Sequence, residues 1–240
     1  MVKITNLSKS YNRGAVKAVD NLNLHVKPGE IFGFLGPNGA GKTTTIKMMV
    51  GLLNPDQGSI FINDYDNQRD PIAAKRSIGY VPDSPEVYDR LTGLEYLDFM
   101  ANVYEVSPDE KKKRISYFLE MFDLVDAAND LIKSYSHGMK QKIVLTGALL
   151  HNPALWIMDE PMVGLDPRSS HLLKELMREH CDRGNTVFFS THILEVAERL
   201  CDRIGIIHKG KLIAIGTLEE LRHGEHAGTL ENIFLELTEQ

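Results

Sequence analysis

The chain has 240 residues, a net charge of -6, and a composition that is 42% hydrophobic and 25% charged. This length allows one large domain, or one domain with an inserted lobe, whose core needs no disulfide or metal to fold. No apolar run reaches the roughly 18 residues of a membrane span, and the first residues lack the apolar core of an export signal. The acidic balance argues against nucleic acid as a partner. The two cysteines, Cys181 and Cys201, lack a metal-ligand spacing, which is typical of packing residues in a reducing cytoplasm.

Short strand-like segments alternate with helix-like segments along the chain, which predicts an α/β fold with a mainly parallel central sheet. Residues 21–26 alternate between apolar and polar side chains and predict a half-buried strand in an N-terminal antiparallel β portion. Four other segments are short and apolar, as buried strands are, and each precedes a polar loop, where α/β sheets place their chemistry. These segments are residues 30–35, 77–81, 155–158 and 186–190.

Between about residues 91 and 135 the pattern changes to helices alone. Thr92 with Glu95, and Ser107 with Glu110, predict capping boxes at two helix starts. We interpret this stretch as an inserted helical lobe.

The last part of the chain returns to strands and ends in helices. Residues 204–208 and 211–215 flank Lys209 and Gly210 and predict a hairpin. From Thr217 onward the tail is predicted to be helical.

The strongest motif lies at residues 36–43, which read Gly-Pro-Asn-Gly-Ala-Gly-Lys-Thr and match GxxxxGK[ST]. The motif follows a predicted strand and precedes a helix, so backbone N–H groups and the helix dipole can surround a phosphate. Lys42 can neutralise β- and γ-phosphate oxygens, and Thr43 can offer its hydroxyl to Mg²⁺. The flanking elements disfavour the alternative, a glycine-rich turn with an incidental lysine. The predicted nucleotide contacts are Gly36, Pro37, Asn38, Gly39, Ala40, Gly41, Lys42, Thr43 and Thr44.

A second motif ends the apolar segment at residues 155–158 with Asp159 and Glu160. An apolar strand that ends in aspartate is typical of a Walker B element, in which Asp159 holds the Mg²⁺ shell. Glu160 can then polarise a water for attack on the γ-phosphate. In isolation the segment could be a simple turn before Pro161.

Three further segments resemble the ABC ATPase family, and they occur in the family's order. Residues 135–142, Tyr-Ser-His-Gly-Met-Lys-Gln-Lys, resemble the signature usually written LSGGQ, although Ser-X-Gly before a helix is also a plain N-cap. Residues 164–166, Gly-Leu-Asp, resemble the D-loop. Residues 190–192, Ser-Thr-His, resemble the H-loop, although a lone histidine at a strand end is more often merely solvated.

The resemblance covers roughly residues 2–220 and implies roles for residues beyond the two Walker motifs. In the family the H-loop histidine, here His192, contacts the γ-phosphate. The signature and D-loop imply nucleotide contacts from Ser136, Gly138, Met139 and Asp166 across a dimer. Tyr11 is at the position of an adenine-stacking aromatic, with Val16 as its apolar neighbour, although Tyr11 could equally be a half-buried strand-end residue.

Two positions depart from the family pattern. The Q-loop glutamine is replaced by Asp83, which can still reach Mg²⁺ but adds negative charge and offers no amide donor. In the signature, His137 replaces the first glycine and Met139 replaces the glutamine. We expect Asp83 to keep a role in the metal shell and His137 to be exposed.

The resemblance implies a single ABC ATPase domain, with a catalytic core at residues 1–90 and 136–216, a lobe at about 91–135 and a tail at 217–240. It also implies an ATP- and Mg²⁺-dependent subunit that powers a transporter when two copies, or one copy and a paralogous subunit, close on ATP. Integral membrane permease subunits would hold it at the inner face of the cell membrane, docked near residues 83–104. The candidate contacts there are Pro82, Pro85, Tyr88 and Tyr104, although a closed helical core explains some of them equally well. The form of the signature and of residues 233–237 is most like bacterial ABC-2 or drug- and peptide-export ATPases. The alternatives are an ABC ATPase that acts on DNA or ribosomes, and a regulatory ATP-binding module.

Overall fold

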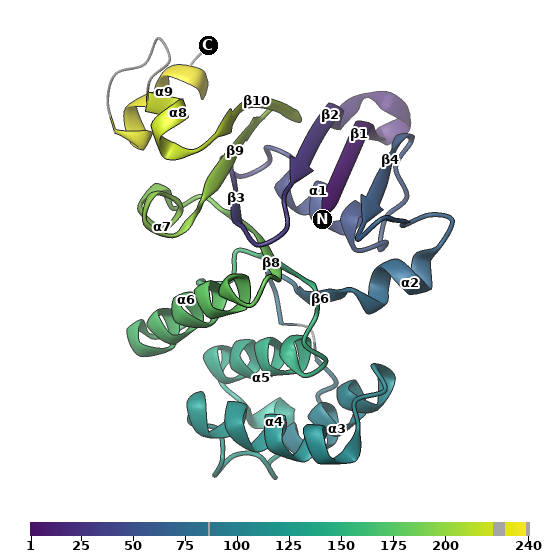
Figure 1. The fold of residues 1–240 in the computed structure, drawn as a ribbon, viewed down its shortest axis with the longest axis vertical. Helices are drawn as coiled ribbons and strands as arrows, with labels where there is room; N and C mark the ends of the chain where they lie inside the picture. Colours follow the sequence, from purple (N-terminus) through teal and green to yellow (C-terminus); the bar gives the residue numbers. More distant parts are fainter. Residues whose placement is uncertain (86, 223–228, 239–240) are drawn as a thin grey trace.

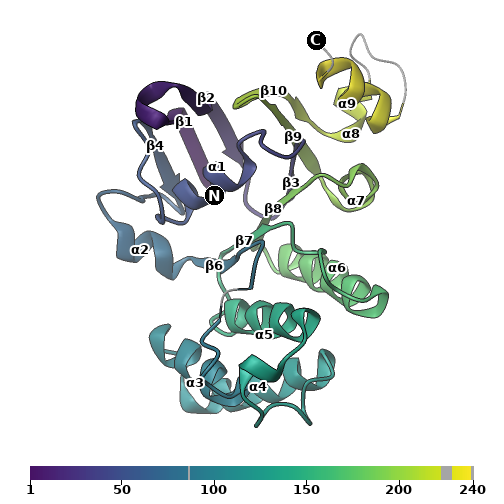
Figure 2. The same ribbon diagram turned by 180° about the vertical axis from the view of Figure 1, so that it is seen from behind.

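The computed structural model describes residues 1–85, 87–222 and 229–238. Figures 1 and 2 show a helical lobe at one end of the molecule and a pair of C-terminal helices at the other, with two sheets between them. No helix within the described ranges is long and apolar enough to cross a membrane.

The N-terminal sheet is antiparallel, as predicted, with strand order β2-β1-β4-β5. Its strands are β1 (Val2–Tyr11), β2 (Val16–Val26), β4 (Gln57–Ile62) and β5 (Tyr65–Asp66). Alternating side chains such as Val2, Ile4 and Leu7 are buried, because this sheet covers helix α1 (Lys42–Met49) and one face of the central sheet.

The central sheet has the order β10-β9-β3-β8-β7-β6, and only β10 runs antiparallel to its neighbour. Its strands are β3 (Ile31–Leu35), β6 (Ile78–Val81), β7 (Leu155–Asp159), β8 (Thr186–Thr191), β9 (Arg203–His208) and β10 (Lys211–Gly216). The predicted buried strands and the hairpin are therefore confirmed. In the parallel register Leu35 lies beside Thr191, and Asp159 beside Ser190, so these strands end at one edge.

The helical lobe contains α3 (Gly93–Val103) and α4 (Pro108–Met121), which pack on α5 (His137–Leu149). The capping box of Thr92 and Glu95 is confirmed, since each side chain accepts a hydrogen bond from the other's backbone N–H. The box predicted at Ser107 is wrong: its side chain makes no cap hydrogen bond, and Glu110 instead pairs with Arg114 one turn later. Proline at the first helical position already removes one of the free N–H groups there. The lobe boundaries at about residues 91 and 135 stay a prediction, because the lobe shares a continuous core with the sheet.

Three short helices and one long one complete the fold around the central sheet. They are α2 (Pro71–Arg76), α6 (Pro167–Asp182), α7 (Leu194–Leu200) and α8 (Leu218–Arg222). The final helix is α9 (Leu230–Thr238), and residues 223–228 and 239–240 of the predicted helical tail lie outside the described residues. Sequence patterns did not predict β4, β5 or α2, which are short and partly polar.

Candidate functional site

The phosphate-binding loop connects β3 to α1 and is shaped by one glycine above all. Gly41 has a φ of 108°, and a Cβ there would lie 2.3 Å from the carbonyl oxygen of Ala18 on β2. Only glycine fits such a position, because both the backbone angle and the close approach exclude a side chain. The loop lines a pocket of about 220 Å³ together with Ala18, Asp83 and Glu160.

Lys42, the first residue of α1, is buried below the loop with 6% of its surface exposed. Its ammonium group donates to the Gly36 carbonyl at 2.7 Å and lies 3.2 Å from Glu160 Oε1. The cation is therefore held at the floor of the pocket by backbone oxygens and one carboxylate.

Asp159, the last residue of β7, is fully buried, and Ser190 of β8 donates its hydroxyl proton to Oδ1. The other oxygen, Oδ2, has no hydrogen-bond partner among the described residues. Burial raises the pKa of Asp159, the charges of Asp83 and Glu160 add to the rise, and the hydroxyls of Ser190 and Thr43 oppose it. A buried carboxylate with one free oxygen is suited to a cation.

Glu160 follows in the left-handed conformation, with a φ of 49°. Its backbone N–H donates to Ser190 Oγ at 3.0 Å, which fixes this uncommon turn. Its carboxylate bridges two groups, since Oε2 lies 3.0 Å from His192 Nδ1 and Oε1 faces Lys42. Three side chains, from the start of α1 and from the residues that follow β7 and β8, thus meet in one row.

The structure also places Asp83 in this pocket, directly after β6. Its Oδ1 accepts a hydrogen bond from the Ser84 backbone N–H at 2.9 Å, and the side chain is exposed. His192 is similarly open, with 48% of its side chain exposed at the end of β8. Both remain free to meet a ligand.

The signature residues do not join this pocket. Ser136 caps α5 by accepting from the Met139 backbone N–H at 3.3 Å, so the plain N-cap role is present. A Cβ on Gly164 would lie 2.3 Å from the His137 ring, and Lys142 Nζ lies 3.1 Å from Asp166 Oδ2. The signature therefore packs on the chain's own segment 164–166.

Asp166 and the two N-terminal candidates have clear structural positions. Asp166 caps α6, and its hydrogen bonds from Ser169, with a further contribution from Lys142, hold its pKa well below the usual range. Tyr11 and Val16 face each other across β1 and β2, with 42% and 50% exposed. Neither lines the pocket, although Ala18 does so two residues further along β2.

Sequence reasoning missed the structural roles of Ala18 and Ser190. Ser190 was noted only as part of the H-loop, yet its hydroxyl ties Asp159 to the Glu160 backbone. A serine one residue before the end of a buried strand is the signal that could have indicated this role. Nothing in the sequence around Ala18 indicates that its carbonyl meets Gly41.

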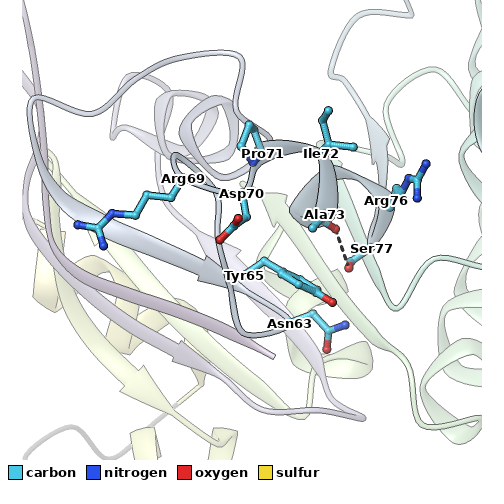
Figure 3. Close-up of a pocket in the computed structure, with 9 residues that line it drawn as sticks. All are labelled: Asn63, Tyr65, Arg69, Asp70, Pro71, Ile72, Ala73, Arg76 and Ser77. Carbon is cyan, nitrogen blue, oxygen red and sulfur yellow. Dashed lines mark hydrogen bonds between the residues drawn. The ribbon is translucent and has the colours of Figure 1, made fainter.

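A larger cavity, of about 630 Å³, lies elsewhere, beside β5 and α2. Figure 3 shows the Tyr65 ring on its floor, while Arg69 and Arg76 point away on opposite sides. Arg76 reaches across to Glu105 of the lobe, with 2.9 Å between Nη2 and Oε1. This cavity has none of the groups that meet in the P-loop pocket, so size alone does not identify the site.

A glycine-rich loop with a buried lysine, and an aspartate and glutamate at the same sheet edge, define a P-loop nucleoside triphosphatase. The ABC transporter family model matches residues 19–163. The chain belongs to this family and is an ATP-binding, ATP-hydrolysing subunit of an ABC transporter.

Relatives and solved structures agree with this membership. The linearmycin resistance ATP-binding protein LnrL of Bacillus subtilis is 42% identical over 92% of this chain and 70% of its own length. The ABC-type transporter ATP-binding protein EcsA of the same organism is 38% identical over 100% of this chain and 97% of its own. A structure of an ATP-binding subunit of an ABC transporter matches with a TM-score of 0.93 and 37% identity over 99% of both chains. The ATP-binding cassette MJ0796, solved as a post-hydrolysis dimer with ADP and Pi, matches with a TM-score of 0.82 and 28% identity over 91% of this chain and 99% of its own.

Proposed function

We propose that each chain binds ATP and Mg²⁺ on its P-loop, and that the signature of a second ATPase subunit completes the site for hydrolysis. The observation that carries this proposal is the row in which Glu160 joins Lys42, at the floor of the pocket, to His192 beside it. In this row the glutamate that would act as the base for water lies within contact distance of both the phosphate-binding cation of Lys42 and the His192 ring.

The nucleotide contacts follow from the pocket lining. Pro37, Asn38, Gly39, Gly41 and Thr44 line it with Lys42 and Thr43, while Gly36 and Ala40 hold the loop in shape. Tyr11 is the last residue of β1 and Val16 is the first residue of β2, and the two are paired and exposed. Their side chains are suited to an adenine ring.

Mg²⁺ fits the donor set of this pocket. Asp159 offers a buried oxygen without a partner, and Thr43 and Asp83 offer a hydroxyl and a carboxylate beside it. The described residues contain no group of three His, Cys, Asp or Glu side chains that could hold a metal alone, which agrees with the preference of Mg²⁺ for phosphate and water ligands. When bound, Mg²⁺ would supply positive charge to the phosphate oxygens.

Asp83→Gln should change the Mg²⁺ concentration that half-saturates turnover. An unchanged Mg²⁺ titration would contradict a role of Asp83 in the metal shell.

In hydrolysis, the chain's own residues position a water and stabilise charge. Lys42 turns from Glu160 to the β- and γ-phosphates, which frees the Glu160 carboxylate to orient the attacking water. His192, which lies 3.0 Å from the Glu160 carboxylate, would contact the γ-phosphate. The ion pair between Lys42 and Glu160 thus holds both groups near their working positions before ATP arrives.

A second subunit is needed because the signature of the same chain lies away from the pocket. Ser136, Gly138 and Met139 at the start of α5 present backbone N–H groups and a hydroxyl to the partner's γ-phosphate. Asp166 follows beside them at the dimer seam. ATP favours the closed dimer because it contacts both subunits, and its hydrolysis releases them.

The other partner is an integral membrane permease, which docks on the lobe and holds the chain at the cytoplasmic face of the membrane. Tyr88 and Phe99 support this surface, since they are 60% and 44% exposed and make an edge-to-face contact at 5.8 Å. Two of the predicted contacts are less accessible, because Pro85 is buried and the half-buried Tyr104 stacks on His151 at 3.6 Å. Phe99→Glu should release the chain from membranes that hold the permease, whereas Tyr117→Glu, at 50% exposure on α4, should not. Equal retention of both variants would contradict this surface.

The direction of transport is outward. Relatives carry the names bacitracin transport protein BcrA, daunorubicin/doxorubicin resistance protein DrrA and SkfA peptide export protein SkfE, at 38–42% identity. The membrane-spanning subunit would select the cargo.

The decisive experiment compares wild type with Glu160→Gln by light scattering after size exclusion and by phosphate release at matched Mg²⁺. We expect wild type to hydrolyse ATP, and the variant to lose at least about a hundredfold in turnover while it forms an ATP-dependent dimer. A variant that keeps its turnover, or a chain that binds ATP without any dimer of the variant, would contradict the proposal.

A further inference from the structure

The C-terminal helices α8 and α9 pack on α7, β9 and β10, around a hydrophobic core of their own. Leu230 and Ile233 of α9 are 0% and 1% exposed and belong to a cluster with Leu35, Ala197, Ile204 and Ile206. Figure 1 shows α8 and α9 beside β9 and β10, with α7 next to them. Leu35 is the residue before the P-loop, so this cluster begins where the phosphate site ends.

Helix α7 is the element that connects this cluster to His192. It has seven residues and begins two residues after His192, and Ala197 is its buried residue. A helix this short has little stability of its own, so its position depends on what packs against it. One side faces β3, where a Cβ on Gly33 would lie 2.5 Å from Cys201 Sγ. The other side faces α9, and Arg222 of α8 forms an ion pair with Glu198 of α7.

His192 has few restraints apart from this helix. Its side chain is 48% exposed and meets Glu160 at 3.0 Å, and the Ile193 N–H behind it donates to Thr191 Oγ1 at 3.0 Å. The placement of the ring thus depends on the strand end before it and on α7 after it.

We propose that α8 and α9 position His192 for hydrolysis by holding α7, with Leu230 and Ile233 as positioning residues. This inference rests on the proposed role of His192. A tail with a purely structural role would change thermal stability alone, whereas a positioning tail changes the chemical step.

The test measures ATP turnover of the full chain at saturating Mg²⁺ for Ile233→Ala, with Leu235→Ala as the matched control on the same helix at 43% exposure. We expect Ile233→Ala to lower kcat about tenfold with little change in KM, because a small misplacement of a catalytic group is costly. Leu235→Ala should match wild type, and Ile233→Val should restore most of the loss. In a His192→Ala background, Ile233→Ala should have no further effect on kcat.

Two additional measurements keep the result decisive. Hydrogen exchange of residues 192–200 should quicken in Ile233→Ala while that of residues 137–149 stays unchanged, a readout that does not depend on turnover. If Ile233→Ala does not fold, Arg222→Ala replaces it, with Arg199→Ala, 78% exposed on α7, as its control. Unchanged kcat and unchanged exchange overturn the inference. A fully active His192→Ala overturns the proposed role of His192 itself, which separates the two failures.

Discussion

The chain carries two regions suited to phosphate, and they differ in how completely one chain builds them. The P-loop is closed by residues outside it as well as by its own backbone, since Lys42 is held by Gly36 and by the distant Glu160, and Gly41 lies against Ala18 of β2. The signature lies at an exposed helix start, where Ser136 and His137 face outward and contacts run mainly to residues 161–166. The difference indicates that the first region can bind ATP alone, whereas the second works only when another molecule brings ATP to it.

The comparison is tested most strongly by mixing two inactive variants. Lys42→Ala damages the first region and Ser136→Ala the second, and each alone should lose about a hundredfold or more in turnover. In a mixed dimer one site carries both changes and the other carries neither. An equal mixture should therefore recover about a quarter of wild-type phosphate release, since half of the dimers are mixed and each has one intact site.

The control for this experiment is a mixture of Lys42→Ala with Glu160→Gln. Both changes lie on the P-loop side, so every mixed dimer has a damaged residue at each site and should stay inactive. Equal recovery in the two mixtures would contradict composite sites.

A second prediction concerns the cost of building the first region. Asp159→Asn should abolish turnover but raise the unfolding free energy of the nucleotide-free chain by about 1 kcal/mol at neutral pH. Burial raises the pKa of Asp159, so the charged form destabilises the native state above that pKa, and the neutral amide removes this cost. The stability difference between Asp159→Asn and wild type should shrink as the pH falls, because the wild-type carboxyl becomes protonated. Thermal melts of both proteins across this pH range measure it, and a destabilised variant at neutral pH would contradict it.

The third prediction concerns the second region. Gly164→Ala should destabilise the chain by about 2 kcal/mol, because the residue has a φ of 80° and because the added Cβ would lie 2.3 Å from the His137 ring. In a His137→Gly background the cost should fall to about 1 kcal/mol, because only the backbone strain remains.

Gly184→Ala is the matched control, since Gly184 has a φ of 88° and nothing within 4 Å of its Cβ position. Its cost in urea unfolding should not depend on His137. A Gly164→Ala cost that is equally independent of His137 would show that the ring does not constrain residues 164–166.

Sequence could predict what depends on local pattern and could not predict what depends on distant contacts. The strands β3, β7 and β8 are buried throughout and have apolar centres, and the P-loop and Walker B residues lie at the ends of β3 and β7, so sequence patterns predict both. The strands β4 and β5 are short and partly exposed, and β4, on which β5 pairs, is itself paired with β1 some fifty positions away in sequence.

The same distinction applies to single residues. Ser107 has the local pattern of a cap, but Glu110 pairs with Arg114 one turn along the same helix, and Arg114 also donates to the distant Leu150 carbonyl. The contact of His137 with Gly164, and that of Ala18 with Gly41, join positions that no spacing rule connects. Asp83 was expected at the site and does line the pocket, because the end of a parallel strand fixes its place.

The two cysteines have a practical consequence for future measurements. Burial raises the pKa of the Cys181 thiol to about 11, and burial also raises that of Cys201, whose sulfur packs against β3 at Gly33. Thiols in this state hold little thiolate at neutral pH and react slowly with maleimides. Fluorescent probes could therefore be attached through new surface cysteines on α3 and α9 without replacing either native cysteine, so that closure and release could be observed in the otherwise unaltered chain.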